Sequence, residues 1–276
     1  MTRVKCEICP HNCSLAEGQK GICNARSNQN GVICNDNYGL ITSIALDPIE
    51  KKPLNRFYPG SKILSVGSYG CNFKCPFCQN YEISMADKDA SSVIFISPED
   101  LVKKALELVP YGNIGIAYTY NEPVIWYEYV RDCSRLAAEN NLKNVLVTNG
   151  YINKKPLLEL LPFIHAMNID LKSFTEGFYK KVGGDPESVK QTVALASEHC
   201  HVEVTTLIIP EENDSPEEMH KLAGWLSSIS RDIPLHISRF FPRYKMSHKE
   251  PTPISTIYSL ADIAREYLTY VYEGNV

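Results

Sequence analysis

The chain has 276 residues, of which 44% are hydrophobic, enough to bury one large core or one core with a small appendage. Lys and Arg number 28 against 32 Asp and Glu, and the net charge of −4 gives no electrostatic reason to expect a nucleic-acid or membrane partner. The first residues show no apolar leader, and no run reaches the ~18 apolar residues of a membrane span.

The first 58 residues form the first predicted region, a small cysteine-rich extension. They contain five of the ten cysteines and many Asn and Gly residues, and they show little helical periodicity. Because no secretory signal is evident, grouped C-x-x-C spacings favour metal binding over disulfides. We therefore predict a soluble, cytoplasmic metalloprotein with an extension over residues 1–58 and a main domain over residues 59–276.

From residue 59 onward, short apolar runs alternate with stretches of helical pattern. The runs are nearly continuous in Val, Ile and Leu, which is typical of parallel strands buried on both faces. We predict strands at Ile63–Val66, Gly115–Tyr120, Asn144–Thr148, Met167–Leu171, Val202–Ile209 and Leu235–Phe240.

Helices are predicted after these strands. One opens at Ser97, a capping residue followed by proline and two acids, and continues to about Val109. The others are predicted at Glu122–Asn140, Lys154–Leu161, Pro186–His199, Pro216–Ser228 and Thr256–Leu268. This alternation implies right-handed βαβ units in an α/β fold, either an open doubly wound sheet or a barrel, and periodicity does not choose between them.

Cys71, Cys75 and Cys78 follow the first predicted strand with C-x3-C-x2-C spacing. Three soft thiolates on one loop suit iron or zinc. A closed structural site takes four protein ligands, whereas a reactive metal keeps one position open. The nearest cysteines outside the loop are Cys34 and Cys133, with no histidine between them. The triplet therefore predicts a reactive metal centre, and the alternative is a zinc loop that a distant cysteine completes.

Polar residues follow strand after strand at the carboxyl end, which is where ligands bind in parallel α/β folds. In chain order they are Asn121 and Glu122, then Asn149, then Asp170 and Lys172, and finally His236 with Arg239 on the last predicted strand. One such residue alone would say little, but several at the same end of a sheet predict a binding site.

Five segments together resemble the radical S-adenosylmethionine (SAM) superfamily, and within it the pyruvate formate-lyase-activating-enzyme-like group. They are Cys71–Asn80 (CNFKCPFCQN), Tyr118–Pro123 (YTYNEP), Val147–Tyr151 (VTNGY), Asp170–Lys172 (DLK) and His236–Pro242 (HISRFFP). The segments Cys6–Cys13 and Asp47–Leu54 are most similar to the AmmeMemoRadiSam branch. The resemblance covers nearly the whole chain, and it implies a partial (β/α)6 barrel rather than an open sheet.

The resemblance also implies two cofactors. A [4Fe–4S] cluster would be bound by Cys71, Cys75 and Cys78, and the amino and carboxylate groups of SAM would chelate the iron that lacks a cysteine. Reduction of the cluster would cleave SAM to methionine and a 5′-deoxyadenosyl radical, which abstracts a hydrogen atom.

Several SAM contacts follow from the same resemblance. Asn121 and Glu122 stand where the family has a Gly-Gly-Glu motif that binds the SAM amino group, and a carboxylate suits an ammonium. Lys172 would hold the SAM carboxylate, with Asp170 beside it on the same side of the strand. The alternatives are a first-turn acid that favours a helix dipole for Glu122, and a surface ion pair for Asp170 and Lys172.

His236 matches the position that meets the ribose hydroxyls, Phe77 would border the adenine, and Asn149 is a further candidate SAM contact. His236 lies in an apolar run, so a core histidine is the alternative reading. Two departures from the family are visible. Val147 stands where some relatives have an acidic residue, and the C-terminal Cys-x-x-Cys tail that members of the closest branch often have is either absent or truncated, since the sequence given stops at Val276.

The N-terminal cysteines form a second candidate metal site. They are Cys6, Cys9, Cys13 and Cys23, in C-x2-C-x3-C-x9-C spacing with Pro10, Gly18 and Gly21 as turn formers. A structural zinc, a second iron–sulfur cluster, and redox or unliganded thiols are all left open. Cys133 and Cys200 lie in helical patterns and are predicted to be small buried hydrophobes.

Three functions remain open from the sequence. The first is a radical SAM enzyme that activates or modifies a partner protein, as the similarity to glycyl-radical activases suggests. The second keeps the radical chemistry but directs it at a small molecule or another macromolecule. The third is a non-catalytic iron–sulfur or zinc protein in electron transfer or assembly. An enzyme would need an electron donor such as flavodoxin or ferredoxin.

Overall fold

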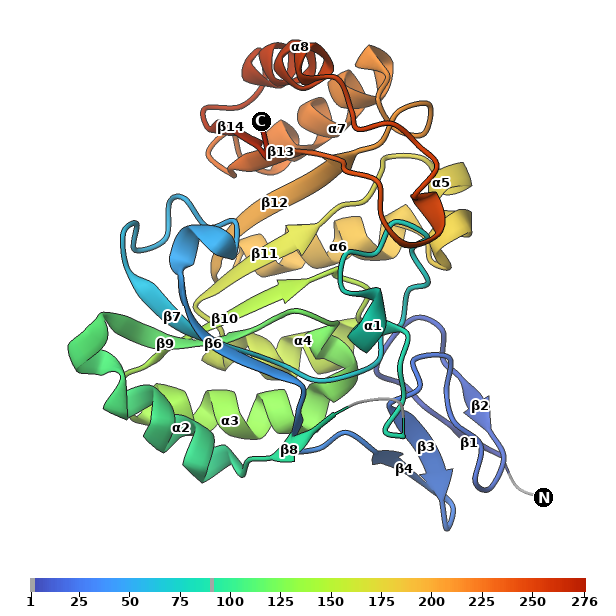
Figure 1. Ribbon diagram of the computed structural model, residues 1–276, viewed down its shortest axis with the longest axis vertical. Coiled ribbons are helices and arrows are strands. Elements are labelled where there is room, and N and C mark those ends of the chain that lie inside the picture. Colours follow the sequence, from blue (N-terminus) through green and yellow to red (C-terminus); the bar gives the residue numbers. More distant parts are fainter. Residues whose placement is uncertain (1–2, 90–91) are drawn as a thin grey trace.

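The computed structural model describes residues 3–89 and 92–276, and in these residues eight strands form one central sheet (Figure 1). The strand order across the sheet is β14-β13-β12-β11-β10-β9-β7-β6. All neighbours from β7 to β14 pair in parallel, and β6 is antiparallel to β7. The chain forms a partial (β/α)6 barrel, which settles the choice that hydrophobic periodicity left open.

The six strands predicted from apolar runs are confirmed within about two residues at each end. They are β7 (Lys62–Gly67), β9 (Asn113–Tyr118), β10 (Lys143–Thr148), β11 (Ala166–Asp170), β12 (His201–Ile208) and β13 (Leu235–Arg239). Parallel strands covered on both faces bury nearly every side chain, and for this reason the runs are continuous rather than alternating.

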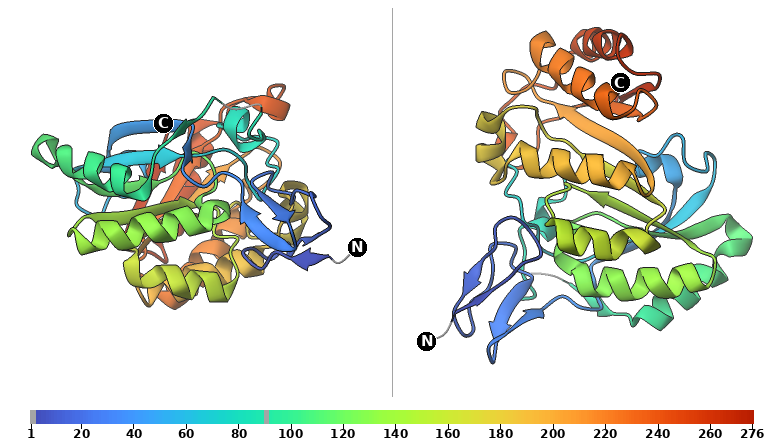
Figure 2. Two further views of the ribbon diagram at one scale, coloured as in Figure 1. Left: turned by 90° about the horizontal axis from the view of Figure 1, so that it is seen from below. Right: turned by 180° about the vertical axis from the view of Figure 1, so that it is seen from behind.

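The predicted helices are also present, on the outer face of the sheet (Figure 2, right). They are α2 (Pro98–Glu107), α3 (Tyr127–Glu139), α4 (Lys154–Leu160), α6 (Pro186–Ser197), α7 (Pro216–Ile229) and α8 (Ile254–Arg265). Ser97 caps α2 by accepting a hydrogen bond from the Asp100 amide, and Asp185 and Ser215 cap α6 and α7 in the same way. The segment Glu122–Asn140 is not one helix, because Pro123–Trp126 forms the short 3-10 helix η3 before α3 begins.

Two edge strands were not expected from the sequence. At one edge, β14 (Val271–Gly274) pairs with β13. At the other, β6 (Ser43–Pro48) pairs with β7 along its whole length, so part of the region expected as an extension belongs to the central sheet. The division of the chain at residue 58 stays a prediction about domains. Two short helices, α1 (Tyr81–Ser84) and α5 (Glu176–Val182), follow the Cys71 loop and β11 in the chain.

The residues before β6 form small two-stranded pieces beside the Cys71 loop. β1 (Val4–Lys5) pairs with β2 (Ser14–Leu15), and β3 (Arg26–Gln29) pairs with β4 (Val32–Asn35). β5 (Leu40–Ile41) pairs with β8 (Ile94–Phe95). In Figure 1 the strands β1 to β4 lie together at the lower right, next to the α1 loop and away from β12 to β14.

A second, smaller group of buried apolar side chains packs between the β6–β7 segment and the central strands. Ile49, Leu54, Phe57, Ile63, Ala117, Val145 and Ala166 form a separate core cluster there. Polar side chains gather instead at the carboxyl ends of the strands. Among the described residues, no helix is both long and apolar enough to cross a membrane.

Candidate functional site

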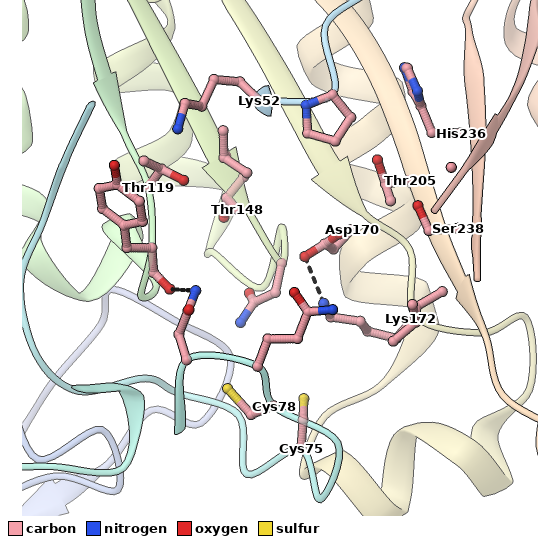
Figure 3. Close-up of a pocket in the computed structure, with 18 of the residues that line it drawn as sticks. Lys52, Cys75, Cys78, Thr119, Thr148, Asp170, Lys172, Thr205, His236 and Ser238 are labelled. Atoms are coloured by element: carbon pink, nitrogen blue, oxygen red, sulfur yellow. Dashed lines mark hydrogen bonds and ion pairs between the residues drawn. The ribbon is translucent and has the colours of Figure 1, made fainter. Parts of the chain in front are cut away.

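The carboxyl ends of the barrel strands surround one cavity of about 650 Å³ (Figure 3). All ten residues that the sequence analysis placed at a cluster and SAM site line it. They are Cys71, Cys75, Phe77, Cys78, Asn121, Glu122, Asn149, Asp170, Lys172 and His236. Figure 3 shows Cys75 and Cys78 at one end of this cavity and Lys52 and His236 toward the other. Arg239 does not line it, and its guanidinium donates instead to the Thr252 carbonyl.

The Cys71 loop leaves β7 through Gly70, whose φ of +86° is a left-handed conformation that favours glycine. The Phe73 amide donates to the Cys71 sulfur at 3.3 Å. Burial raises the pKa of the Cys75 thiol to about 12, and it raises the pKa of Cys71 as well. Such thiols are not free nucleophiles, and a bound cation is what would hold them as thiolates.

Asn121 holds this loop in place with both ends of its carboxamide. Its Oδ1 accepts from the Ser68 amide at 2.9 Å, and its Nδ2 donates to the carbonyls of Tyr69 and Gly70 at 3.2 and 3.0 Å. The Asn121 side chain is therefore engaged with the protein. The contact to the SAM amino group that the resemblance implied for Asn121 remains a prediction.

Glu122 is 2% exposed, and its carboxylate binds the next strand end. It accepts hydrogen bonds from Val124 N, from the Thr148 hydroxyl at 2.6 Å and from the Asn149 amide at 2.7 Å. Burial raises the pKa of Glu122 to about 7, although these donors oppose the shift. As the N-cap of η3 it fulfils the alternative role of a helix-start acid, and its contact to the SAM amino group remains a prediction.

Asn149 connects the third strand end to the Cys71 loop. Its Nδ2 donates to the Asn72 side chain at 2.8 Å and lies 3.9 Å from the Cys71 sulfur. Its Oδ1 accepts from the Tyr151 amide at 2.9 Å. A hydrogen-bond donor beside a metal-bound sulfur changes the basicity of that sulfur and the reduction potential of the metal.

Asp170 and Lys172 form an ion pair of 2.6 Å inside the cavity, not on the outer surface. Burial alone would lower the pKa of the Lys172 ammonium, but Asp170 and the sulfurs of Cys75 and Cys78 raise it above its ordinary value. Lys172 therefore places a permanent positive charge beside the triplet, where a ligand carboxylate can bind.

His236 is 6% exposed and stacks on Tyr272, with ring centroids 5.2 Å apart. Its Nε2 lies 2.6 Å from Oε2 of Glu203, a residue that sequence reasoning missed. The sequence did contain a sign of this residue, because Glu203 is a charged residue inside the otherwise apolar run of β12. Phe77 is buried and packs against Phe178 at a centroid distance of 5.8 Å.

A second group that sequence reasoning missed lies at the end of the cavity away from the triplet. Lys52 is 3% exposed, and its Nζ lies 2.9 Å from Oδ2 of Asp47. The Tyr120 hydroxyl donates to the same oxygen at 2.8 Å. Both charged residues belong to the segment Asp47–Leu54 that the resemblance singled out, but their chemistry was not inferred from it.

The N-terminal cysteines lie apart from this cavity. Cys6, Cys9, Cys13 and Cys23 line a second, much smaller cavity of about 10 Å³. Within residues 3–89 and 92–276, no three Cys, His, Asp or Glu side chains are grouped tightly enough to hold an ion without moving. This applies to the Cys71 triplet and to the N-terminal set alike, so side chains would have to adjust on metal binding at either place. Cys133 is buried, as predicted, and Cys200 is half-buried.

Comparisons with known proteins agree with the barrel fold described above. The model of the radical SAM superfamily matches residues 65–223. An uncharacterised protein of Methanocaldococcus jannaschii is 44% identical over 99% of this chain and 82% of its own length. The pyruvate formate-lyase 1-activating enzyme of Escherichia coli is 23% identical over 55% of this chain and 63% of its own length. A crystallised domain of pyruvate formate-lyase-activating enzyme from Bacteroides vulgatus has the same fold, with a TM-score of 0.52 at 15% identity over 58% of this chain and 99% of that domain.

Proposed function

Because the chain belongs to the radical SAM superfamily, we propose that Cys71, Cys75 and Cys78 hold its [4Fe–4S] cluster and that SAM binds in the adjoining cavity. Members of this superfamily are enzymes, and this chain is one. The cluster and SAM, when bound, supply reductive cleavage of SAM and a hydrogen-abstracting radical. The proposal on the site rests above all on one observation, that the three thiols share a cavity with the half-buried Lys172–Asp170 pair.

The size and chemistry of the cavity fit these cofactors. Its volume of about 650 Å³ lies within the ~300–1,000 Å³ of sites that enclose small molecules. Thiolates are the usual ligands of iron–sulfur clusters, and the loop offers three of them. Lys172 would bind the SAM carboxylate, because an ammonium with a raised pKa stays charged. Phe77 would border the adenine, and Asp170 keeps the Lys172 side chain oriented.

His236 would meet the ribose. Its Nε2–H donates a hydrogen bond to the Glu203 carboxylate, so the other ring nitrogen, Nδ1, is left as an acceptor for a hydroxyl. Glu122 would meet the SAM amino group with whatever acceptor capacity its three protein donors leave. Asn121 and Asn149 would act on the cluster loop more than on SAM, since their carboxamides bond to that loop.

We propose a partner protein as the target of the radical. The support is similarity to the pyruvate formate-lyase 1-activating enzyme and to putative glycyl-radical enzyme activating enzymes. A small electron-transfer protein such as flavodoxin or ferredoxin would reduce the cluster. A small-molecule target is the second candidate, favoured by the volume of the cavity beyond the triplet and by the polar group of Lys52 and Asp47 at its far end. The N-terminal cysteines would hold a second metal.

The chemistry is tested by anaerobic reconstitution with iron and sulfide, reduction with dithionite and addition of SAM, with 5′-deoxyadenosine as the measured product. The proposal expects product from the reconstituted chain and none from a Cys75→Ala variant. Absence of product, together with a cluster spectrum that SAM does not change, would leave a non-catalytic iron–sulfur protein.

The target is tested separately with SAM deuterated at the 5′ carbon. A partner protein that acquires a radical or deuterium in the presence of this chain supports the first candidate. Turnover that depends on an added small-molecule fraction, with the label in a small product other than 5′-deoxyadenosine, would overturn the first candidate in favour of the second.

A further inference from the structure

Two tight turns bring the four N-terminal cysteines to one place. In the first turn, the Cys6 amide donates to the Cys13 carbonyl at 2.9 Å, and the Asn12 amide donates to the Cys9 carbonyl at 3.0 Å. These bonds fold the Cys6–Cys13 segment back on itself between β1 and β2. A C-x-x-C segment in such a turn presents two sulfurs to the same side, as metal-binding knuckles do.

The second turn adds the fourth cysteine. The Gly21 amide donates to the Arg26 carbonyl at 2.7 Å, and the Asn24 amide donates to Gly21 at 3.0 Å. The sulfurs of Cys13 and Cys23 both lie 3.7 Å from the point that a Cβ on Gly21 would occupy. Residues far apart in the first 23 positions thus supply a common set of thiols.

The size of the cavity limits what these thiols can hold. As the side chains lie, its volume of about 10 Å³ corresponds to about one water-sized sphere, which favours a single ion over a four-iron cluster. Apart from the cysteines and Arg26, its lining is Ile8, Leu15, Gly21, Ile22 and Ile125, which offer no other ligand side chain. A closed set of four thiolates in apolar surroundings is the donor set of a structural zinc site.

Arg26 supplies a second, independent indication of a bound ligand. It is 4% exposed and lines the cavity together with the four cysteines. Its terminal nitrogens bond to both carboxylate oxygens of Glu128 at 2.6 Å, whereas its Nε has no hydrogen-bond partner among the described residues. A buried N–H without a partner is costly, and a zinc-bound thiolate would accept from it.

The charges are consistent with the same ligand. Four thiolates around one divalent ion leave two negative charges in an apolar cavity, which need compensation nearby. The Arg26 guanidinium offsets part of that charge. Glu128 on α3 fixes the position of the guanidinium, and Asn35 donates to the same carboxylate at 2.8 Å.

The two turns that carry the N-terminal cysteines contact the Cys71 loop directly. His11 Nε2 lies 2.8 Å from the Asn72 carbonyl, one residue after Cys71. The carboxamide of Asn153 donates to the carbonyls of Glu7 and Cys9 at 2.7 and 3.2 Å. A Cβ on Gly70 would overlap the Cys23 carbonyl oxygen, so the two loops are in close contact.

We propose that Cys6, Cys9, Cys13 and Cys23 hold one zinc ion as four thiolates, that Arg26 donates to a bound sulfur, and that this zinc knuckle positions the Cys71 loop. The four side chains close on the ion from a backbone that already brings them together. The zinc site stands on its own residues, whereas its positioning role rests on the function proposed for the Cys71 triplet.

The metal is tested in a chain that lacks the triplet, Cys71→Ala/Cys75→Ala/Cys78→Ala, so that the result is independent of radical chemistry. We expect about one zinc and no iron per chain by elemental analysis. Adding Cys9→Ser and Cys23→Ser should remove the zinc, whereas adding Cys34→Ser should not, because Cys34 lies on β4 nearby but does not line the cavity. No metal in the parent, zinc retained without Cys9 and Cys23, or iron with cluster absorption would each overturn the assignment.

Cobalt titration covers the case in which the serine variants do not fold. The triplet-free chain is stripped with chelator and titrated with Co²⁺, with its N-terminal cysteines intact. One equivalent should give the absorption of a tetrahedral four-thiolate site, and zinc should displace it. A complex with fewer thiolates, or no complex, would overturn the proposal.

The positioning role is tested with the triplet intact. A Cys9→Ser/Cys23→Ser variant should take up less iron at the triplet on reconstitution, with the cluster spectrum altered. Arg26→Gln should keep the zinc but release it faster to a chelator, and Arg26→Lys should restore part of the difference. Unchanged iron uptake in a zinc-free, folded variant would overturn the positioning role and leave the zinc assignment intact.

Discussion

Nε2 of His236 lies 2.6 Å from Oε2 of Glu203, and both side chains are buried. Glu203 also accepts from His201 and from the backbone amides of Asn55 and Arg56. One carboxylate thus joins β12 to β13 and to the segment between β6 and β7. Burial on its own would raise the pKa of Glu203, but these hydrogen bonds lower it to about 2.

The pKa of Glu203 predicts an acid-dependent contribution to stability. A carboxyl with a folded-state pKa below its ordinary value stabilises the fold fully above that ordinary value, and the stabilisation is lost as the pH falls toward about 2. The shift corresponds to about 3 kcal/mol at neutral pH. Urea unfolding of the cluster-free chain should give a higher free energy of unfolding for wild type than for Glu203→Gln at pH about 6. This difference in free energy should become smaller as the pH falls toward about 3.

The control for this experiment is Glu187→Gln on the exposed face of α6, where the side chain is 66% exposed and its ion pair with Lys190 contributes little. Its unfolding free energy should follow wild type at every pH. Parallel profiles for wild type and Glu203→Gln would show that Glu203 does not carry this contribution.

The sequence predicted the parallel strands well, because a strand buried on both faces leaves an apolar run that is visible locally. It did not predict the edge strands. β14 (Val271–Gly274) mixes a charge and a glycine into four residues, and β6 contains Pro48, which an edge position tolerates. Whether the strands close into a barrel depends on twist and register across the sheet, which no single segment encodes.

The site was predictable to the extent that its residues follow strand ends. Asp170 and Lys172 are two positions apart on one strand, so their common side follows from the sequence. The partner of His236 does not follow, because Glu203 is 33 residues away and meets it only through the pairing of β12 with β13. For the same reason Arg26 gave no signal beside the N-terminal cysteines, since its role depends on Glu128, 102 residues later.

Replacing Lys172 with alanine should weaken SAM binding while leaving the cluster in place. Removal of a charge-assisted hydrogen bond to a ligand carboxylate costs about 1.5–3 kcal/mol, or roughly 10- to 100-fold in dissociation constant. The measurement is equilibrium binding of SAM to the reconstituted chain, with iron content as a check. Lys180→Ala on the exposed face of α5 is the control. Unchanged SAM affinity in Lys172→Ala would contradict the role assigned to this ammonium.

Asn121→Ala should destabilise the cluster loop more than it affects SAM contacts. The substitution leaves the Ser68 amide and the Gly70 carbonyl without the side-chain partner they have in the wild type, at about 1–3 kcal/mol for each buried group, whereas the Tyr69 carbonyl still accepts from Asn37. We expect a lower melting temperature and less iron retained after gel filtration. Asn140→Ala, at the exposed end of α3, removes one carboxamide bond and should change neither. Full iron retention in Asn121→Ala would argue that the loop holds its shape without this residue.

Gly70 and Gly177 form a matched pair for testing the contact between the Cys71 loop and the N-terminal cysteines. At Gly70, alanine would carry a left-handed φ of +86°, its Cβ would overlap the Cys23 carbonyl, and it would lie 3.1 Å from Ile125 Cδ1. At Gly177, inside α5, an added Cβ meets nothing within 4 Å. Gly177→Ala should therefore stabilise the chain by about 0.5–1 kcal/mol through helix propensity. Gly70→Ala should lower the melting temperature and reduce both the iron and the zinc bound, since the two loops cannot keep their spacing. If Gly70→Ala bound both metals like wild type, the close packing of the two cysteine loops would not matter for either site.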